Sequence, residues 1–238
     1  MKSFSKIFLL SLVGGLFGAF LFTVFNDRYT ANISSSSALA SSTVLPPTPT
    51  PSPYLWEDLI SEASLRVVAI QVLKDNRLVR QGSGLIISSD GVIATSSYLA
   101  VSGAIYQVFY EGKIVKGIVA DLDYKTNLLL LKVPDSYQNI ADLGDISYKS
   151  GAEIMLVGKF MNIAKPTVFS QNGTISFVAS SAVGVDTILD PNLYGVGVIG
   201  KDGNFLGISF LNKGKVVLAD VISIERLFQD YIIKESKK

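Results

Sequence analysis

The stretch that decides the fold is Gly82-Ser-Gly-Leu-Ile-Ile-Ser-Ser-Asp-Gly-Val-Ile-Ala-Thr95. It holds two short apolar runs, residues 83–88 and 92–95, on either side of Ser89-Asp-Gly91. Two such runs joined by a glycine-containing turn are typical of two antiparallel strands. The stretch therefore predicts a β-hairpin, with a turn at Ser89-Asp-Gly91.

Similar runs continue in both directions, separated by turn residues. They lie at residues 66–73, 105–110, 114–121, 127–133, 154–158, 167–170 and 174–179. Asn172-Gly173 predicts a further hairpin turn before the last run. Many short strands at this spacing indicate an all-β sandwich or a pair of barrels.

The carboxy-terminal stretch has a different period. Its apolar residues recur at helical spacing, namely Ile224, Leu227, Phe228, Tyr231 and Ile232. That spacing forms one apolar face of a helix, so we expect the β domain to end in an α-helix.

The amino-terminal segment indicates a membrane anchor. Residues 7–25 are uncharged and follow Lys2 and Lys6. As a helix they would span roughly 28 Å, close to the hydrocarbon core of about 30 Å. The lysines predict a cytoplasmic amino terminus and an extracytoplasmic domain. A cleaved signal peptide is the alternative, but the small residues Ala38-Leu-Ala40 lie far beyond the apolar run, where a cleavage site is not expected.

Residues 29–55 carry no charge and include Pro-Pro-Thr-Pro-Thr-Pro-Ser-Pro at 46–53. Such a segment favours extended polyproline II, which suits a spacer better than a proline-directed binding motif. The sequence therefore predicts three parts. They are an anchor with its flanks at 1–28, a linker at 29–55 and a β domain at 56–238.

Composition excludes several classes of function. The chain has 21 basic and 20 acidic residues, so no basic field exists to attract nucleic acid. It has no cysteine and no histidine, which leaves carboxylates as the only strong metal ligands. We expect neither a metal site nor a cofactor.

The ordered set of motifs in the β domain resembles the high-temperature-requirement (HtrA/Deg) group of trypsin-like serine proteases over roughly residues 56–232. The motifs are Val67-Val-Ala-Ile-Gln-Val72, Gly82–Gly91, Thr126-Asn-Leu-Leu-Leu-Leu-Lys-Val133, Leu143-Gly-Asp145, Gly151-Ala-Glu153 and Asp202-Gly-Asn-Phe-Leu-Gly-Ile208. The resemblance implies two perpendicular six-stranded β-barrels with the active site in the crevice between them. It covers the protease domain and no PDZ domain.

The same resemblance locates the positions of the catalytic triad. Tyr98, in Thr95-Ser-Ser-Tyr-Leu-Ala100, stands where the family has its histidine. Asn127 stands at the aspartate position and Tyr194 at the nucleophilic serine. A phenol with a pKa near 10 is a poor proton shuttle at neutral pH, and the chain has no imidazole to take its place.

The resemblance also puts the oxyanion hole in doubt. Asn192 replaces a glycine whose backbone N–H helps to form the hole, Tyr194 contributes the second position, and Val196 replaces a glycine that follows the nucleophile. Asp186 matches a position near the former specificity pocket.

We therefore expect a membrane-anchored, extracytoplasmic pseudoprotease that binds a protein or peptide partner. One alternative is an active endopeptidase with a non-standard catalytic group. The other is a structural subunit that self-associates or pairs with an active homologue, which the family's trimers and the Gly14-x-x-x-Gly18 motif suggest.

Overall fold

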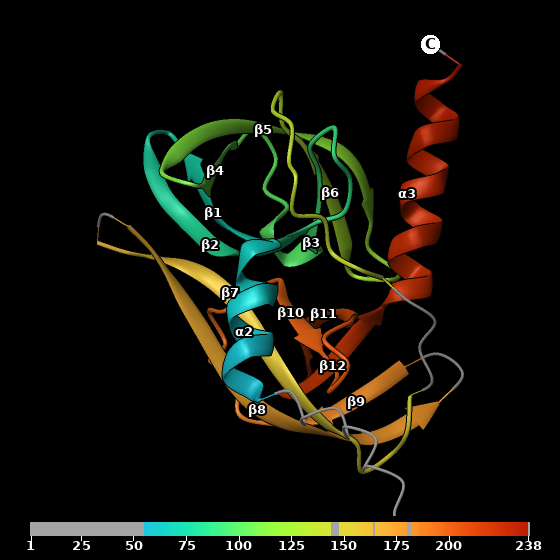
Figure 1. Ribbon diagram of the computed structural model, residues 1–238. Helices are drawn as coiled ribbons and strands as arrows, with labels where there is room; N and C mark the ends of the chain where they lie inside the picture. The colour runs from blue at the N-terminus through green and yellow to red at the C-terminus, as the bar shows by residue number, and fades with distance from the viewer. Residues whose placement is uncertain (1–54, 144–147, 164, 180–181, 238) are drawn as a thin grey trace, which may run out of the picture. The chain divides into compact units, whose positions relative to one another are not determined.

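The computed structural model describes residues 55–143, 148–163, 165–179 and 182–237 (Figure 1). Within these ranges no helix is long and apolar enough to cross a bilayer. The anchor predicted at residues 7–25 lies outside them, as does nearly all of the predicted linker.

Twelve strands form two closed antiparallel barrels, which confirms the predicted pair of six-stranded barrels. The first barrel has the strand order β1-β2-β3-β6-β5-β4 and the second β10-β11-β12-β9-β8-β7. Strands of the first are β1 (Val67–Lys74), β2 (Arg77–Ile86), β3 (Val92–Ser96), β4 (Ile105–Tyr110), β5 (Lys113–Asp123) and β6 (Leu128–Lys132). Strands of the second are β7 (Glu153–Asn162), β8 (Lys165–Ala179), β9 (Ala182–Asp186), β10 (Val196–Ile199), β11 (Phe205–Asn212) and β12 (Lys215–Asp220).

Each barrel has its own apolar interior. Side chains alternate between the inside and the outside of the barrels along the strands, except where the register shifts, as between Val72 and Leu73 in β1 and between Ile175 and Phe177 in β8. In the first barrel Ile70, Ile93 and Leu129 are fully buried in one cluster. In the second, Leu156 and Val198 are fully buried in another.

A third cluster joins the two barrels and the two long helices. It combines outward-facing residues of the first barrel, such as Leu130, with residues of the second, such as Phe205. Helix α2 (Trp56–Leu65) contributes Leu59, and helix α3 (Val221–Glu235) contributes Ile224. The barrels are therefore packed against one another through an apolar joint, and Figure 1 shows them side by side.

The predicted carboxy-terminal helix is confirmed as α3. Its first turn is capped by Asp220, whose carboxylate accepts a hydrogen bond from the Ser223 N–H at 2.8 Å. Ile224, Leu227 and Tyr231 are buried on one face, while Ile232 at the edge of that face is exposed. The face therefore packs on the joint between the barrels.

The decisive hairpin also forms as predicted. β2 and β3 are antiparallel, and the Ile87 N–H closes the turn on the Val92 carbonyl at 2.9 Å. Gly91 has φ +93°, and a Cβ there would lie 2.5 Å from the Asp135 carbonyl oxygen. Glycine is thus required both by the backbone conformation and by a close approach.

The hairpin predicted at Asn172-Gly173 is wrong. Both residues lie inside the single long strand β8 and pair with Met155 and Ile154 of β7. The absence of a Cβ at Gly173 instead lets Thr187 and Val185 approach, because a Cβ there would lie 3.2 Å from each. A glycine inside a strand can mark close approach of another segment as well as a turn.

Candidate functional site

Tyr98 lies in the short 3-10 helix η1 (Ser97–Leu99), which directly follows β3. The Ser96 hydroxyl caps this turn by accepting a hydrogen bond from the Tyr98 N–H at 3.3 Å. Leu99 is fully buried in the first barrel and anchors the turn, whereas Tyr98 is 40% exposed. The Arg80 guanidinium donates to the carbonyl oxygens of Tyr98 and Ala100. These hydrogen bonds hold the turn against β2.

Tyr194 lies in the loop before β10 and is held against the first barrel. Its carbonyl oxygen accepts a hydrogen bond from the Ser83 N–H at 2.8 Å, and it forms an isolated parallel bridge with Gly82. A Cβ on Gly82 would lie 2.6 Å from the Tyr194 carbonyl oxygen. Because Gly82 has no side chain, the Tyr194 loop can lie directly against β2.

The rings of Tyr98 and Tyr194 are stacked. Their centroids lie 5.8 Å apart and their planes differ by 7°. Offset stacking at this separation is a favourable geometry for two aromatic rings. The two positions that the resemblance assigns to base and nucleophile are thus brought together, one from each barrel's connecting segments.

Asn127 reaches the same site through its backbone. Its carbonyl oxygen accepts a hydrogen bond from the Ser97 N–H at 2.9 Å, immediately beside Tyr98. Asn127 has φ +58°, in the left-handed region that asparagine tolerates better than most residues.

The turn before Asn127 is organised by Asp123. The Asp123 carboxylate accepts hydrogen bonds from the Lys125 N–H and the Thr126 hydroxyl, both at 2.8 Å. Burial raises the pKa of Asp123, but these hydrogen bonds outweigh burial, and the pKa lies below its ordinary value. The ionised carboxylate therefore holds the turn that presents Asn127.

Asn192, at the position assigned to the oxyanion hole, has its donors engaged. Its backbone N–H and its side-chain amide both donate to one carboxylate oxygen of Asp190, at 2.8 and 3.1 Å. The Leu193 N–H closes the same turn on the Asp190 carbonyl at 2.9 Å. A carboxylate thus accepts from the donor that the resemblance assigns to the oxyanion hole, and its negative charge would repel an anion there.

Asp190 was not singled out from the sequence. The signal was present, because an aspartate two residues before a backbone N–H, with proline between them, is the usual pattern of an Asx turn. Val196, also expected near the site, is instead fully buried in the interior of the second barrel.

Asp186 does not join the tyrosine pair. It ends β9, where it pairs with Thr174, and it is exposed. Its neighbours around a cavity of about 340 Å³ are Trp56, Glu153 and Thr174. The sequence-based grouping of Asp186 with the other site residues has no counterpart in these contacts.

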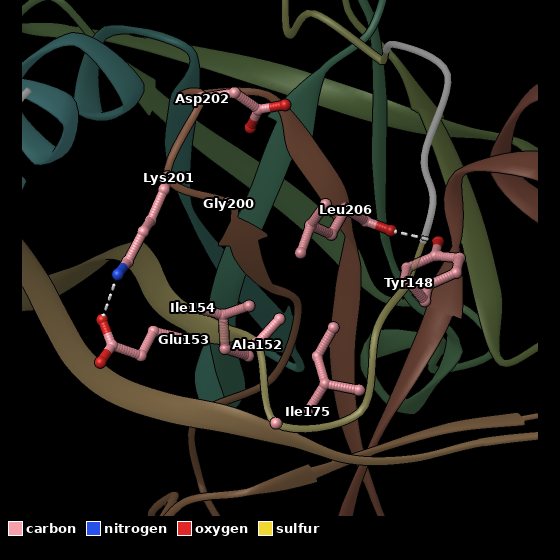
Figure 2. Close-up of a pocket in the computed structure, with 10 residues that line it drawn as sticks. Tyr148, Ala152, Glu153, Ile154, Ile175, Gly200, Lys201, Asp202 and Leu206 are labelled. Atoms are coloured by element: carbon pink, nitrogen blue, oxygen red, sulfur yellow. Dashed lines mark hydrogen bonds and ion pairs between the residues drawn. The ribbon is translucent and has the colours of Figure 1, made fainter. Parts of the chain in front are cut away.

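A larger cavity, of about 470 Å³, opens at one end of the second barrel (Figure 2). Ile154, Ile175 and Leu206 form its apolar wall. The Tyr148 hydroxyl donates to the Leu206 carbonyl at 2.7 Å, and burial raises the pKa of Tyr148 to about 12. The tyrosine is therefore a neutral, fixed part of the wall at neutral pH.

Charged side chains lie at the rim of that cavity. The Lys201 ammonium and the Glu153 carboxylate form an ion pair at 2.7 Å, with Asp202 nearby (Figure 2). In the part of the chain that the structure describes, no group of three or more histidine, cysteine, aspartate or glutamate side chains could hold a metal ion. This cavity suits an apolar side chain better than a metal or an anion.

Comparison with known proteins finds similarity to serine proteases. The sequence is 24% identical over 204 residues to serine protease HTRA4 of Mus musculus, covering 75% of this chain and 41% of that protein. The chain thus spans less than half of this relative's length. The sequence matches no established family profile.

Two solved structures share the fold. One is a serine endoprotease from Yersinia pestis, with a TM-score of 0.67 and 18% identity over 76% of this chain and 68% of that chain. The other is Deg5, with a TM-score of 0.61 and 17% identity over 71% of this chain and 90% of that chain. The chain therefore has the two-barrel fold of trypsin-like serine endoproteases, and its sequence is similar to that of a mouse HtrA protease.

Proposed function

We propose that this protein is a membrane-anchored, extracytoplasmic pseudoprotease of HtrA type, which binds a protein or peptide partner and cleaves nothing. In this proposal the two-barrel scaffold supplies a rigid binding body. The residues at the former catalytic positions stabilise the joint between the barrels.

The stacked pair Tyr98–Tyr194 is the observation that carries the proposal. The two rings lie together at the positions that the resemblance assigns to the base and the nucleophile. The whole sequence contains no histidine that could replace the base. Without a base near neutral pH, a hydroxyl cannot be activated in the manner of this fold.

The turn at Asp190 adds independent support. Transition-state stabilisation by a serine protease requires free backbone N–H donors directed at the developing oxyanion. Here the Asn192 N–H donates to the Asp190 carboxylate instead. The residues at the positions of the base, the nucleophile and the oxyanion hole are thus all unsuited to serine-protease catalysis.

The membrane part of the proposal rests on the sequence of residues 7–25, with Lys2 and Lys6 before them. The length of that apolar stretch and the position of its flanking lysines favour a single span with a cytoplasmic amino terminus. The uncharged linker at 29–55 would then hold the two-barrel domain outside the cytoplasm.

Casein degradation by the full-length chain in mild detergent tests the proposal directly. We expect no cleavage by the wild-type chain or by Tyr194→Ala, beside an active trypsin-like protease as the positive control. Casein cleavage that persists after repurification of the chain would contradict the proposal that it is a pseudoprotease.

A staged restoration identifies which loss matters. Tyr98→His, Asn127→Asp and Tyr194→Ser together should leave the chain inactive, because the Asn192 N–H remains bonded to Asp190. Adding Asp190→Ala and Asn192→Gly would release that donor. Robust cleavage by the first triple variant would show that the oxyanion hole is intact, contrary to the proposal.

An active endopeptidase with another catalytic group is the second candidate, and Lys159 is the residue with which to test it. Burial lowers the pKa of Lys159, in β7, while Glu111 opposes this shift. An amine with a lowered pKa can serve as a general base. If casein were cleaved, loss of that activity in Lys159→Met would assign the base to Lys159.

A structural subunit paired with an active homologue remains the third hypothesis. Its expected signature is a full-length particle heavier than a monomer in mild detergent, with an active homologue in the same fraction. A monomeric mass without a co-purifying homologue would exclude it.

A further inference from the structure

The outer surface of the first barrel carries an apolar row across four strands. Leu73 of β1 pairs with Leu78 of β2 on one side and with Ile105 of β4 on the other. Residues paired directly across antiparallel strands point to the same face. The β4–β5 register, in which Tyr106 pairs with Gly117, brings Ile118 opposite Ile105.

This row is open to solvent. Leu78 is 52% exposed, Ile105 43% and Ile118 60%. The inward-facing neighbours Val72 and Tyr106 are buried in the first barrel, so the row lies on the outside of the barrel wall. Aliphatic side chains adjoining one another at this exposure are uncommon on a domain that has no partner there.

The next outward-facing row is polar but carries no carboxylate. It consists of Gln81, Gln71, Gln107 and Lys116, in register across β2, β1, β4 and β5. We call the two rows together the outer face of the first barrel. Neither row holds an aspartate or a glutamate, although the whole chain has 20.

Cations border the outer face. Lys74 and Arg77 pair at the end of the β1–β2 hairpin, and Lys116 lies within the second row. Among the residues that the structure describes, no ion pair involves any of the three. Asp75 is the one carboxylate in this hairpin, so residues 74–80 keep a net positive charge with Arg80.

We propose that the outer face of the first barrel lies on an anionic lipid surface, with Leu78, Ile105 and Ile118 at the headgroup boundary. This inference rests on the proposed membrane anchor, since the anchor would keep the domain near a bilayer. Aliphatic side chains bordered by cations match the chemistry of an anionic lipid surface. A second copy of the chain would meet the same unpaired cations, which disfavours that occupant.

The position of the face gives the contact a consequence. Arg80, in the same hairpin, donates to the carbonyl oxygens of Tyr98 and Ala100. Lipid contact at the hairpin would therefore orient the tyrosine pair relative to the membrane. A partner that binds at the tyrosine pair would then approach along the bilayer surface.

The test uses the absence of cysteine from the sequence. The full-length chain with Leu78→Cys is labelled with an environment-sensitive fluorophore and reconstituted into lipid discs of phosphatidylcholine, with or without one quarter phosphatidylglycerol. We expect a blue shift of the label, and its quenching by a lipid-borne quencher, in the anionic discs only. The matched control is Ile188→Cys, which is 88% exposed in the loop between β9 and β10 and should show neither change.

Charge reversal then tests the cations. Arg77→Glu with Lys116→Glu in the labelled chain should lower the ratio of inserted to free label by at least about fivefold per reversed cation, and about 0.5 M salt should also lower it. Lys215→Glu, at an exposed cation of the second barrel, should leave insertion unchanged.

Each contrary result has its own meaning. Equal label emission in neutral and anionic discs, or an equal shift at both labelled sites, would overturn the lipid contact. A blue shift of the label in detergent that grows with protein concentration would show that a second copy of the chain, and not lipid, covers the face. A chain that does not stay in the discs would refute the anchor, and the same labelled chain with added anionic vesicles would then decide the contact by itself.

Discussion

Gly195 and Gly103 have the same backbone conformation in different surroundings. Both have φ +71°. A Cβ on Gly195 would lie 2.2 Å from the Ser83 carbonyl oxygen and 2.3 Å from the Thr95 hydroxyl, whereas a Cβ on Gly103 would meet nothing within 4 Å. Single residues at this site therefore decide how closely the Tyr194 loop can approach the first barrel.

This pair separates steric contact from backbone strain. Gly103→Ala should cost about 1–2 kcal/mol of unfolding free energy, the usual penalty for the left-handed region. Gly195→Ala adds a clash with backbone and should cost about 1–3 kcal/mol more. Urea denaturation of both variants measures the difference. Equal losses would mean that the loop is free to move away from Ser83.

The tyrosine pair makes a second prediction at this scale. A double-mutant cycle of Tyr98→Ala and Tyr194→Ala should give a coupling energy of about 0.5–1.5 kcal/mol, because stacked rings contribute beyond their buried area. Pairing Tyr194→Ala with Tyr124→Ala, at an exposed tyrosine, should give about zero. No coupling in the first cycle would remove the stabilising role that we assign to the stack.

At the scale of elements, short turns between the strands position the residues of the site. The turn from Asp123 to Asn127 and the turn from Asp190 to Asn192 each depend on one carboxylate that accepts two hydrogen bonds. Such local bonds replace strand pairing where the backbone leaves the barrel. The ionisation of Asp123 therefore acts on the element that presents Asn127.

The pH dependence of that element can be predicted in sign. The folded-state pKa of Asp123 lies below its ordinary value, so its contribution is present above about pH 4 and is lost as the pH falls through the folded pKa. Asp123→Asn should thus lower the unfolding free energy by about 1 kcal/mol at pH 7. The difference between wild type and variant should shrink towards pH 2. Asp230→Asn, at an exposed site on α3, is the control, and a pH-independent difference for Asp123→Asn would contradict the mechanism.

At the scale of the whole molecule, Ser83 connects the two barrels. It is fully buried, and its hydroxyl donates to the Val68 carbonyl while accepting from the Lys159 N–H, at 3.1 and 3.0 Å. Its own N–H donates to the Tyr194 carbonyl. One residue of the decisive stretch thus bonds to β1, to β7 and to the loop that carries Tyr194.

Removing this hydroxyl should destabilise the joint. Ser83→Ala leaves the Lys159 N–H without its acceptor, which should cost about 1–3 kcal/mol by chemical denaturation. Ser209→Ala is the matched control, because its buried hydroxyl donates to Val196 within one barrel and no N–H among the described residues donates to it. A loss in Ser209→Ala as large as that in Ser83→Ala would show that the bond between barrels has no special role.

The sequence by itself determined the class of fold. Alternating apolar residues and the turn at Ser89-Asp-Gly91 are local signals. They predict the strands and the hairpin correctly because each of these structures forms within a few neighbouring residues. The resemblance to HtrA proteases singled out Tyr98, Asn127 and Tyr194, and these three residues lie close together in the structure.

Tertiary structure alone decided the contacts. The same kind of glycine signal that marks a turn at Gly91 lies inside a strand at Gly173, because the long partner strand β7 pairs past it. The stack of Tyr98 on Tyr194, the bridge through Ser83 and the exposed row on the first barrel all join residues far apart in the sequence. Such contacts depend on barrel closure and strand register, which no single stretch of sequence encodes.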